Sequence, residues 1–480
     1  MTQAPPTDLP ATLQAYRRAI DSLYSLVTDP TGDRVFEDKS DRLVQHEHAE
    51  RLARTTDFLD FAGNPQQQYR TVHIAGTSGK GSVAAITAAI LGRAGRRTGL
   101  HVSPYLQLPL EKLVVNGQMA APGNFAASVR RLMRLRDDWV RANRAFNDLR
   151  YGEAWVALTY LWLAWQRVEW AVIETGLGGR YDPTNAITPE LSLITNVNFD
   201  HTKSLGPGLL SIAHHKAGII KPGRPAVTTE TNPEVIELFQ REAARQGSRL
   251  YVLGRDFDCS VTAQDGRGIT VDVQGPFNRY PGLRLNLPGA FQARNVALAV
   301  AGLDVLAGGG ALSLPAAQVA EAVAAVKFPG RMELVQDSPR VILDGAHNPH
   351  KIEALARSIR ATYPQQPITA IVGMMRVKDA EGILSNLAPL VSRFIVTAPV
   401  VFGKRSFPPD ELAAIIRAVA PAAKVQVVES VKDSVKYALA TLPVEELLLV
   451  TGSIYLVGEA RDTWFPREEL LAQLELNQTE

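Results

Sequence analysis

Residues 72–82 read VHIAGTSGKGS, and this stretch decides the fold class that the sequence predicts. Its first four residues form a short apolar run of the kind found in a buried strand. A loop of glycine, serine and threonine follows, and residues 83–91 have the composition of a helix. A strand, a glycine-rich loop and a helix in this order open a nucleotide-binding α/β unit.

The loop at residues 75–82 has the chemistry of a phosphate-binding loop. Glycines allow backbone N–H groups to approach phosphate oxygens, and the N-terminus of the following helix adds a positive potential. Lys80 can reach the β- and γ-phosphates, and the Ser82 hydroxyl can bind Mg²⁺. The spacing departs from the usual pattern, because Ile74 stands at the first glycine position and Gly81 separates Lys80 from Ser82. The strand–loop–helix context still favours a phosphate loop over an incidental glycine turn.

Strands and helices alternate after this loop, which predicts a mostly parallel sheet covered on both faces. Further strands are predicted at residues 98–102, 170–173, 191–195 and 225–228, and helices at about 124–145, 152–166 and 233–246. Residues 256–288 carry alternating runs punctuated by glycine, which predict a small antiparallel excursion. Two helices are predicted after it, at about 291–307 and 314–326, and residues 11–65 read as mostly helical.

A break at residues 327–331, KFPGR, precedes a second α/β alternation. Its strands are predicted at 341–343, 368–372, 394–397, 425–428 and 447–450, and its helices near 350–362, 379–388, 409–419 and 430–441. The sequence therefore predicts two α/β domains, one at residues 1–328 and the other at residues 329–480.

The composition excludes several classes of protein. The chain has 480 residues and a formal net charge of +2, which argues against a nucleic-acid-binding protein with a large basic face. Its one cysteine, Cys259, excludes an intramolecular disulfide and a thiolate metal cage. The N-terminus lacks a secretory pattern, and the most apolar stretch, residues 154–165, is too short to span a bilayer. We expect a soluble, cytoplasmic monomer with no nucleic-acid or membrane partner.

Candidate metal ligands stand at the ends of two predicted strands. Glu174 ends the first of them, and Asp200-His201 follows the strand at residues 191–195. In open α/β sheets, ligands bind at the carboxyl ends of strands. A carboxylate at that edge can hold Mg²⁺ beside bound phosphates. Each residue taken alone is more often structural, but together, behind a phosphate loop, they favour a metal site.

Motifs spread over residues 70–460 resemble those of the dihydrofolate synthase/folylpolyglutamate synthase family of the Mur-ligase superfamily. The matching strings are GTSGKGS at 76–82, SPYL at 103–106, ETGLGGRYDPTN at 174–185, DHT at 200–202, HKAGIIKPG at 215–223, QARN at 292–295, PGR at 329–331, DGAHNP at 344–349, KD at 378–379 and TGSIY at 451–455. The resemblance implies an α/β fold. Its P-loop, Mur-ligase-like ATPase domain has a mostly parallel sheet, and a smaller Rossmann-like domain follows.

The same resemblance implies an ATP-dependent amide ligase. In this family ATP phosphorylates a carboxylate, and the amino group of L-glutamate attacks the resulting acyl phosphate. The implied substrates are ATP, L-glutamate and a folate or dihydropteroate, with Mg²⁺ as cofactor. The implied enzyme is a bifunctional dihydrofolate synthase/folylpolyglutamate synthase.

Residue roles carry over from the family by position. The resemblance implies an ATP-binding set consisting of Thr77, Ser78, Gly79, Lys80, Gly81, Ser82, Asn295, Arg331 and Asp344. It implies a Mg²⁺-binding set consisting of Ser103, Glu174 and His201. The nucleotide would lie between the two domains, with the linker near residue 330 as hinge.

The implied catalytic residues are Lys80, His201 and Lys216. Lys216 occupies the position of a carbamylated lysine in the family, although its sequence context alone favours an ordinary lysine on a helix surface. The resemblance also implies two sets of substrate contacts. These are Tyr151, Gly152 and Glu153 on the dihydropteroate side, and His347 and Ser453 on the glutamate side.

Several departures from the family pattern fall on the acceptor side. They are Tyr105 for histidine, Gln107 and Lys112 for arginines, Asn198-Phe199 for Gly-Leu, His214-His215 for Arg-Glu, and a poorly matching loop at residues 25–34. Three alternatives therefore stay open. The enzyme could be restricted to polyglutamylation, or could be a Mur-type ligase acting on another carboxylate. It could also be a nucleotide-binding switch without ligase activity, although the predicted second domain argues against that.

Overall fold

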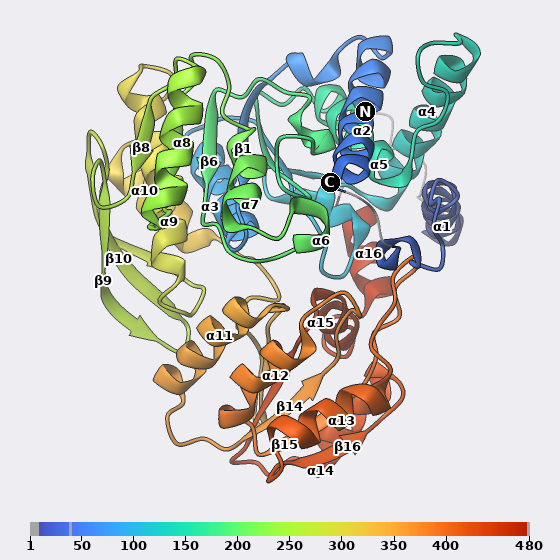
Figure 1. The fold of residues 1–480 in the computed structure, drawn as a ribbon, viewed down its shortest axis with the longest axis vertical. Coiled ribbons are helices and arrows are strands. Elements are labelled where there is room, and N and C mark those ends of the chain that lie inside the picture. Colours follow the sequence, from blue (N-terminus) through green and yellow to red (C-terminus); the bar gives the residue numbers. More distant parts are fainter. Residues whose placement is uncertain (1–8, 38–40, 478–480) are drawn as a thin grey trace, which may run out of the picture.

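The computed structural model describes residues 9–37 and 41–477, and it contains two α/β domains (Figure 1). The first domain is built on an eight-stranded sheet with the spatial order β4-β3-β2-β5-β1-β6-β7-β8. The strands are β1 (Arg70–Ala75), β2 (Thr98–His101), β3 (Val114–Val115), β4 (Gln118–Met119), β5 (Trp170–Glu174), β6 (Leu191–Ile194), β7 (Ala226–Thr228) and β8 (Leu250–Val252). Along the spatial order from β2 through β5, β1, β6 and β7 to β8, all neighbouring strands are parallel. Strands β3 and β4 form an antiparallel edge beside β2. The predicted mostly parallel sheet is confirmed.

Strand β1 lies at the centre of this sheet, between β5 and β6. The chain moves past β5 to form β2 after it leaves β1, so the direction of winding reverses beside β1. Such a reversal opens a crevice at the carboxyl ends of the strands. The loops that follow β1, β5 and β6 therefore start next to one another.

Helices cover both faces of the first sheet because its strands are apolar on both sides. On one face, Val72 and Val172 join a core with α3 (Lys80–Arg93), α9 (Gln292–Gly308) and α10 (Ala316–Ala325). On the other face, Ala171 and Ile173 pack with α1 (Leu9–Tyr24), α4 (Pro122–Arg141) and α5 (Tyr151–Trp165). The remaining helices of this domain are α2 (Asp41–Phe61), α6 (Thr202–Leu205), α7 (Leu209–Ala217) and α8 (Pro233–Arg245).

A three-stranded antiparallel sheet forms the predicted excursion. It consists of β9 (Asp258–Asp265), β10 (Gly268–Gln274) and β11 (Arg279–Leu285), with β10 in the middle. Alternate residues of β10, Ile269, Val271 and Val273, are buried in the same core as α9. The period-two pattern that predicted this sheet therefore reflects one face packed on helices.

The second domain holds a six-stranded sheet with the order β12-β13-β17-β14-β15-β16. Its strands are β12 (Glu333–Asp337), β13 (Arg340–Leu343), β14 (Ile368–Val372), β15 (Arg393–Val396), β16 (Lys424–Val427) and β17 (Leu447–Thr451). Its helices are α11 (Pro349–Thr362), α12 (Ala380–Leu387), α13 (Pro409–Val419), α14 (Val431–Thr441) and α15 (Ile454–Arg461). All pairs are parallel except β12 with β13, and β12 is a strand that the sequence did not predict.

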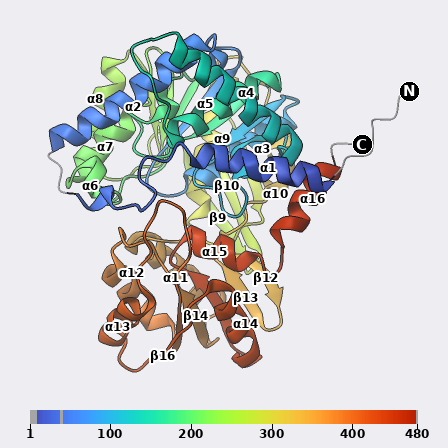
Figure 2. The same cartoon turned by 90° about the vertical axis from the view of Figure 1, so that its right-hand side faces the viewer.

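The last helix, α16 (Arg467–Leu476), leaves the second domain and packs against the first (Figure 2). Leu471 lies in the core formed by α1, α4 and α5. Glu475 accepts a hydrogen bond from the Gly123 backbone N–H at 2.8 Å, and Glu468 pairs with Arg17 at 2.7 Å. The chain thus crosses between the domains twice, near residue 330 and again before α16. Within residues 9–37 and 41–477, no helix is both long enough and apolar enough to cross a membrane.

Candidate active site

The loop between β1 and α3 is held from one side by the segment that follows β6. The backbone N–H of Thr77 donates to the Asn196 carbonyl at 2.8 Å, and that of Ser78 donates to the Asn196 side-chain oxygen at 3.0 Å. The Thr77 hydroxyl also accepts a hydrogen bond from the Asn198 N–H at 3.0 Å. These bonds fix the loop without occupying the N–H groups at the start of α3 that a phosphate needs.

Glycine is required at two positions of this loop. Gly79 has φ = +83°, and a Cβ there would collide with the Asn295 carboxamide. A Cβ on Gly81 would lie 2.6 Å from the Phe328 ring and 3.4 Å from Glu174 Oε2. The unusual glycine between Lys80 and Ser82 therefore has a physical cause, which is the close approach of the linker ring. Asn295 is placed against the loop, as its predicted role requires.

The Lys80 ammonium lies between the phosphate loop and Glu174. Its Nζ donates to the Gly76 carbonyl at 3.2 Å and stands 3.9 Å from Glu174 Oε1. Glu174 ends β5 and is buried, and its Oε2 accepts the Ser103 backbone N–H at 3.0 Å. Burial raises the pKa of the Glu174 carboxyl, and the charge of Lys80 opposes that shift. Sequence analysis thus predicted three residues that the fold brings together.

His201 stands at the start of α6 with a left-handed backbone, φ = +53°. Its side chain is about half exposed, and its Nε2 lies 3.8 Å from Asp200 Oδ1. Loss of surrounding water lowers the pKa of the imidazole to about 4, and the nearby Lys378 and Lys80 charges add to the shift against the pull of Asp200. The ring is therefore neutral at pH 7, which is the form that binds metals.

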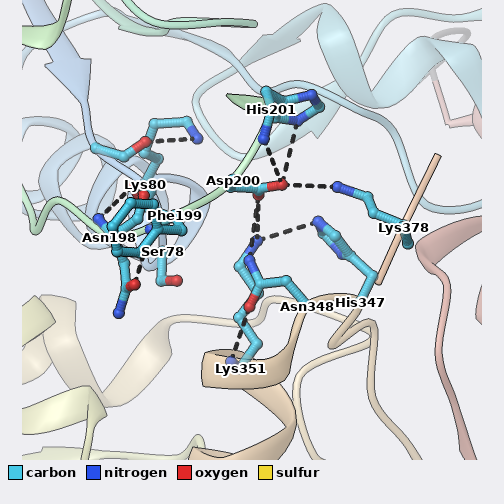
Figure 3. Close-up of polar contacts among 12 residues, drawn as sticks. Ser78, Lys80, Asn198, Phe199, Asp200, His201, His347, Asn348, Lys351 and Lys378 are labelled. Atoms are coloured by element: carbon cyan, nitrogen blue, oxygen red, sulfur yellow. Dashed lines mark hydrogen bonds and ion pairs between the residues drawn. The ribbon is translucent and has the colours of Figure 1, made fainter. Parts of the chain in front are cut away.

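Asp200 connects the two domains (Figure 3). It accepts hydrogen bonds from Lys378 Nζ at 2.9 Å and from Asn348 Nδ2 at 3.2 Å, and Lys351 Nζ lies 3.9 Å away. Burial alone would raise the pKa of Asp200, but His201 and the two lysines hold it well below its usual range. Asp200 is therefore an anion with a cationic face of the second domain set against it. The sequence identified Asp200 as a candidate metal ligand, but here Lys378 and Asn348 occupy its carboxylate. Asn348 and Lys378 lie in strings that match the family but had no assigned role, and Lys351 lies outside those strings.

His347 belongs to the same interdomain cluster. Its Nδ1 lies 2.8 Å from the Gly345 carbonyl, which can only accept, so Nδ1 carries the proton. Its Nε2 lies 3.1 Å from Lys351 Nζ and accepts from it. Burial lowers the pKa of His347 well below its usual value and that of Lys351 to about 7. A neutral imidazole and a readily deprotonated amine are thus hydrogen-bonded to each other at the domain interface.

Arg331 and Asp344 lie on the second-domain side of the linker. The Arg331 guanidinium lies 5.4 Å from the centre of the Phe328 ring. Burial raises the pKa values of both the Glu174 and the Asp344 carboxyls, and the charge of Arg331 opposes that shift. Arg331 is therefore within electrostatic range of the phosphate loop. Asp344 accepts the backbone N–H of Met332 at 2.9 Å and that of Ala346 at 2.8 Å. Its carboxylate holds the linker in place, and its predicted contact with the nucleotide stays a prediction.

Lys216 is buried in α7, so it is not the helix-surface lysine that its sequence context favours. Burial lowers the pKa of its amine well below the usual value, and the charge of Lys80 adds to this shift. Asp200 acts in the opposite direction. Burial therefore favours the neutral form of this amine, which lies within electrostatic range of Lys80 in the phosphate loop.

The remaining predicted substrate contacts already interact with other parts of the protein. Glu153 is fully buried and accepts two hydrogen bonds from Arg54, at 2.9 and 3.2 Å, so its carboxylate already has a structural partner. A Cβ on Gly152 would lie 3.3 Å from Arg51 Nη2, and Tyr151 stacks on Tyr24 at 5.8 Å. Ser453 caps α15 through the Tyr455 N–H at 3.2 Å. Substrate contacts by these four residues stay predictions.

Comparisons with known proteins place this site in a family. The sequence model of the Mur ligase glutamate ligase domain matches residues 330–454. The folylpolyglutamate synthase of Lacticaseibacillus casei is 33% identical over 422 residues, which cover 86% of this chain and 95% of the relative. This chain belongs to the dihydrofolate synthase/folylpolyglutamate synthase family. The family's membership of the Mur-ligase superfamily makes the chain an ATP-dependent, amide-forming ligase and rules out the nucleotide-binding switch.

Two further similarities cover most of the chain. The dihydrofolate synthase/folylpolyglutamate synthase of Mycobacterium tuberculosis is 33% identical over 365 residues, covering 72% of this chain and 74% of the relative. The solved folylpolyglutamate synthase of the same organism, complexed with ADP, superposes with a TM-score of 0.79 at 30% identity. The superposed region covers 89% of this chain and 98% of the chain of the solved protein. The predicted two-domain Mur-ligase fold is therefore confirmed.

Proposed function

We propose that this member of the dihydrofolate synthase/folylpolyglutamate synthase family uses ATP to join L-glutamate to the carboxylate of a folate-type acceptor, through an acyl phosphate. One observation carries the proposal. Asp200, in the segment that holds the phosphate loop, bonds directly to Lys378 and Asn348 of the second domain. A ligase must bring an activated carboxylate to an amine, and this contact sets the phosphate loop against the cationic face of the glutamate ligase domain.

The phosphate side is assigned to the residues of the first domain. The N–H groups at the start of α3, from Gly79 to Ser82, receive the phosphates of ATP. Lys80 and Arg331 stabilise the charge that develops on the transferred phosphoryl group. Thr77, Ser78 and Asn295 support the loop, and Asp344 positions Arg331 through the linker backbone.

The donor set fits Mg²⁺, which prefers oxygen ligands and is usually held by one or two carboxylates together with phosphate oxygens. Glu174 offers a buried carboxylate next to Lys80, and the Ser103 hydroxyl lies 3.8 Å from the position of a Cβ on Gly176, the second residue after Glu174. Ser103, Glu174 and the neutral His201 would hold the ion. Bound Mg²⁺ would offset negative charge on the triphosphate.

The glutamate side is assigned to the second domain. Lys378 presents positive charge to the carboxylates of L-glutamate, and Ser453 lies at the start of α15 in the same domain. The amino group must lose a proton as it attacks the acyl phosphate. Lys351, whose pKa burial lowers to about 7, can accept that proton on its amine, and His347 Nε2 holds this amine in place by accepting a hydrogen bond from it.

We propose that Lys216 carries a carbamate. Carbon dioxide reacts only with a neutral amine, and burial favours that form of Lys216. The modified side chain would replace a cation with an anion, within range of the Lys80 and Lys351 charges that act on this position.

We further propose the domain division after residue 328, with ATP between the domains. A cytoplasmic monomer remains our expectation from the sequence.

The acceptor is tested by measuring glutamate-dependent phosphate release with three acceptors: dihydropteroate, tetrahydrofolate monoglutamate and a muramyl precursor. We expect turnover with both folate-side acceptors, as in a bifunctional enzyme, and none with the muramyl precursor. Turnover with tetrahydrofolate alone would restrict the enzyme to polyglutamylation. Turnover with the muramyl precursor alone would contradict the folate assignment in favour of the Mur-type alternative.

A further inference from the structure

Five aromatic side chains, called here the aromatic cluster, meet where the two domains approach each other. They are Tyr24, Tyr105, Tyr151, Trp155 and Phe402. Tyr24 lies at the centre, stacked on Tyr151 at 5.8 Å and packed against Phe402 at 5.0 Å. Its hydroxyl is 3.5 Å from that of Tyr105, and Trp155 meets Tyr151 edge-on at 6.4 Å. Four members belong to the first domain, and Phe402 alone comes from the second.

A chain of contacts leads from the phosphate loop to this cluster. Lys80 is 3.9 Å from Glu174, and the Lys112 ammonium lies 5.5 Å from the centre of the Trp155 ring. Burial lowers the pKa of Lys112 to about 8, and the charge of Glu174 opposes that shift, so Lys112 is within electrostatic range of Glu174. Lys112, Trp155 and Glu174 are buried, so these contacts link positive charge beside the phosphate loop with the flat rings of the aromatic cluster.

The loop that carries Phe402 is fixed to the N-terminal part of the chain. Arg405 forms an ion pair with Asp33, and a Cβ on Gly32 would lie 2.8 Å from the Gly403 carbonyl. The Lys404 ammonium lies 4.5 Å from the centre of the Tyr455 ring. Despite these contacts, the Phe402 side chain is 51% exposed. An aromatic ring is thus held over Tyr24 while much of its surface remains open.

Resting on the function proposed above, we propose that Phe402 determines specificity for the acceptor. The planar ring system of the acceptor binds against Tyr24 and Tyr151, and Phe402 packs on it from the second domain. The acceptor carboxylate then points toward the phosphate loop and Lys80. Because Phe402 now touches Tyr24, its exposed side chain must turn away to admit the ring, while the contacts of Gly403 and Arg405 keep the loop in place. Rigid aromatic side chains suit this contact because they offer large faces and lose little entropy on binding.

The test compares three substitutions of Phe402 with a control on the same loop. Phe402→Ala removes the ring, Phe402→Leu keeps apolar volume without a ring, and Phe402→Tyr keeps the ring. Val400→Ala is the control, because its side chain is 89% exposed. The KM for tetrahydrofolate monoglutamate is measured separately from the KM values for ATP and L-glutamate, and thermal unfolding checks the fold.

We expect the alanine and leucine variants to raise the acceptor KM about tenfold, the size of one lost aromatic stack. The KM values for ATP and glutamate should stay within about twofold, and the tyrosine variant and the control should match the wild type. An unchanged acceptor KM in both ring-free variants, or an equal rise in all three KM values, overturns the proposal. Absence of folate-dependent turnover in the wild type instead overturns the proposed function on which it rests.

Discussion

Replacing Lys80 with alanine is expected to lower kcat for ligation by about a thousandfold or more, because preorganised charge on a transferring phosphoryl group contributes several kcal/mol to catalysis. The Lys80 ammonium is held between the Gly76 carbonyl and Glu174, at the start of the helix that receives the phosphates. Its removal leaves Glu174 without the nearest opposing charge. Steady-state phosphate release at saturating ATP, acceptor and glutamate measures the effect.

Two controls make this result specific. Lys424→Ala removes an exposed lysine from β16 and should leave kcat unchanged. Lys80→Arg keeps the positive charge but replaces a compact ammonium with a wide planar group, so it should not restore turnover. A folded Lys80→Ala protein with kcat within tenfold of the wild type would refute the role given to this residue.

Replacing Lys216 with alanine is expected to lower kcat by about a hundredfold, the usual size of effect when a group that tunes a metal site is lost. The carbamate on this buried lysine is an anion, and alanine supplies neither the charge nor the oxygen atoms. Added acetate should restore part of the activity, because a small carboxylate can occupy the space that the alanine variant leaves. The measurements are kcat as a function of acetate concentration and the intact mass of the wild-type protein prepared with bicarbonate.

The controls separate the carbamate from a purely structural role. Lys216→Arg fills the space but cannot form the carbamate, so it should be inactive and unaffected by acetate. The wild-type protein should show an added mass of one carbon dioxide that disappears on removal of bicarbonate. Wild-type turnover in Lys216→Ala, without any carbon dioxide adduct in the native enzyme, is the outcome that contradicts the modification.

Much of the fold could be predicted because its signals are local. The run at residues 72–75, the glycine loop and the apolar strands of both domains lie in short continuous segments, and both domains alternate as predicted. Strand β12 was missed because ELVQD mixes polar and apolar residues and is only partly buried on both sides. The docking of α16 on α1 and α4 depends on residues far away along the chain, such as the Arg17–Glu468 pair separated by 451 positions and the Gly123–Glu475 pair separated by 352.

The candidate site, like the fold, could be predicted only where local sequence and sheet topology determine it. Lys80, Glu174 and Ser103 stand at the ends of adjacent strands, so their meeting follows from sheet topology. The partners of Asp200 lie 148 and 178 positions along the chain in another domain, beyond the reach of any local pattern. The burial of Lys216 and the Arg54–Glu153 pair likewise depend on tertiary packing. The aromatic cluster joins four distant segments, so sequence alone identified only Tyr151 from it as a site residue.

The central claim is that one molecule of ATP is used for each glutamate joined to a folate-type acceptor. The most direct test incubates the enzyme with ATP, Mg²⁺, L-glutamate and tetrahydrofolate monoglutamate, and follows the folate by mass spectrometry while ADP and phosphate are counted. The account predicts a product heavier by one glutamyl residue, with one ADP and one phosphate for each residue added, and no net ADP when glutamate or the acceptor is omitted. ADP formed at the same rate without acceptor or glutamate, with no heavier folate, would contradict it.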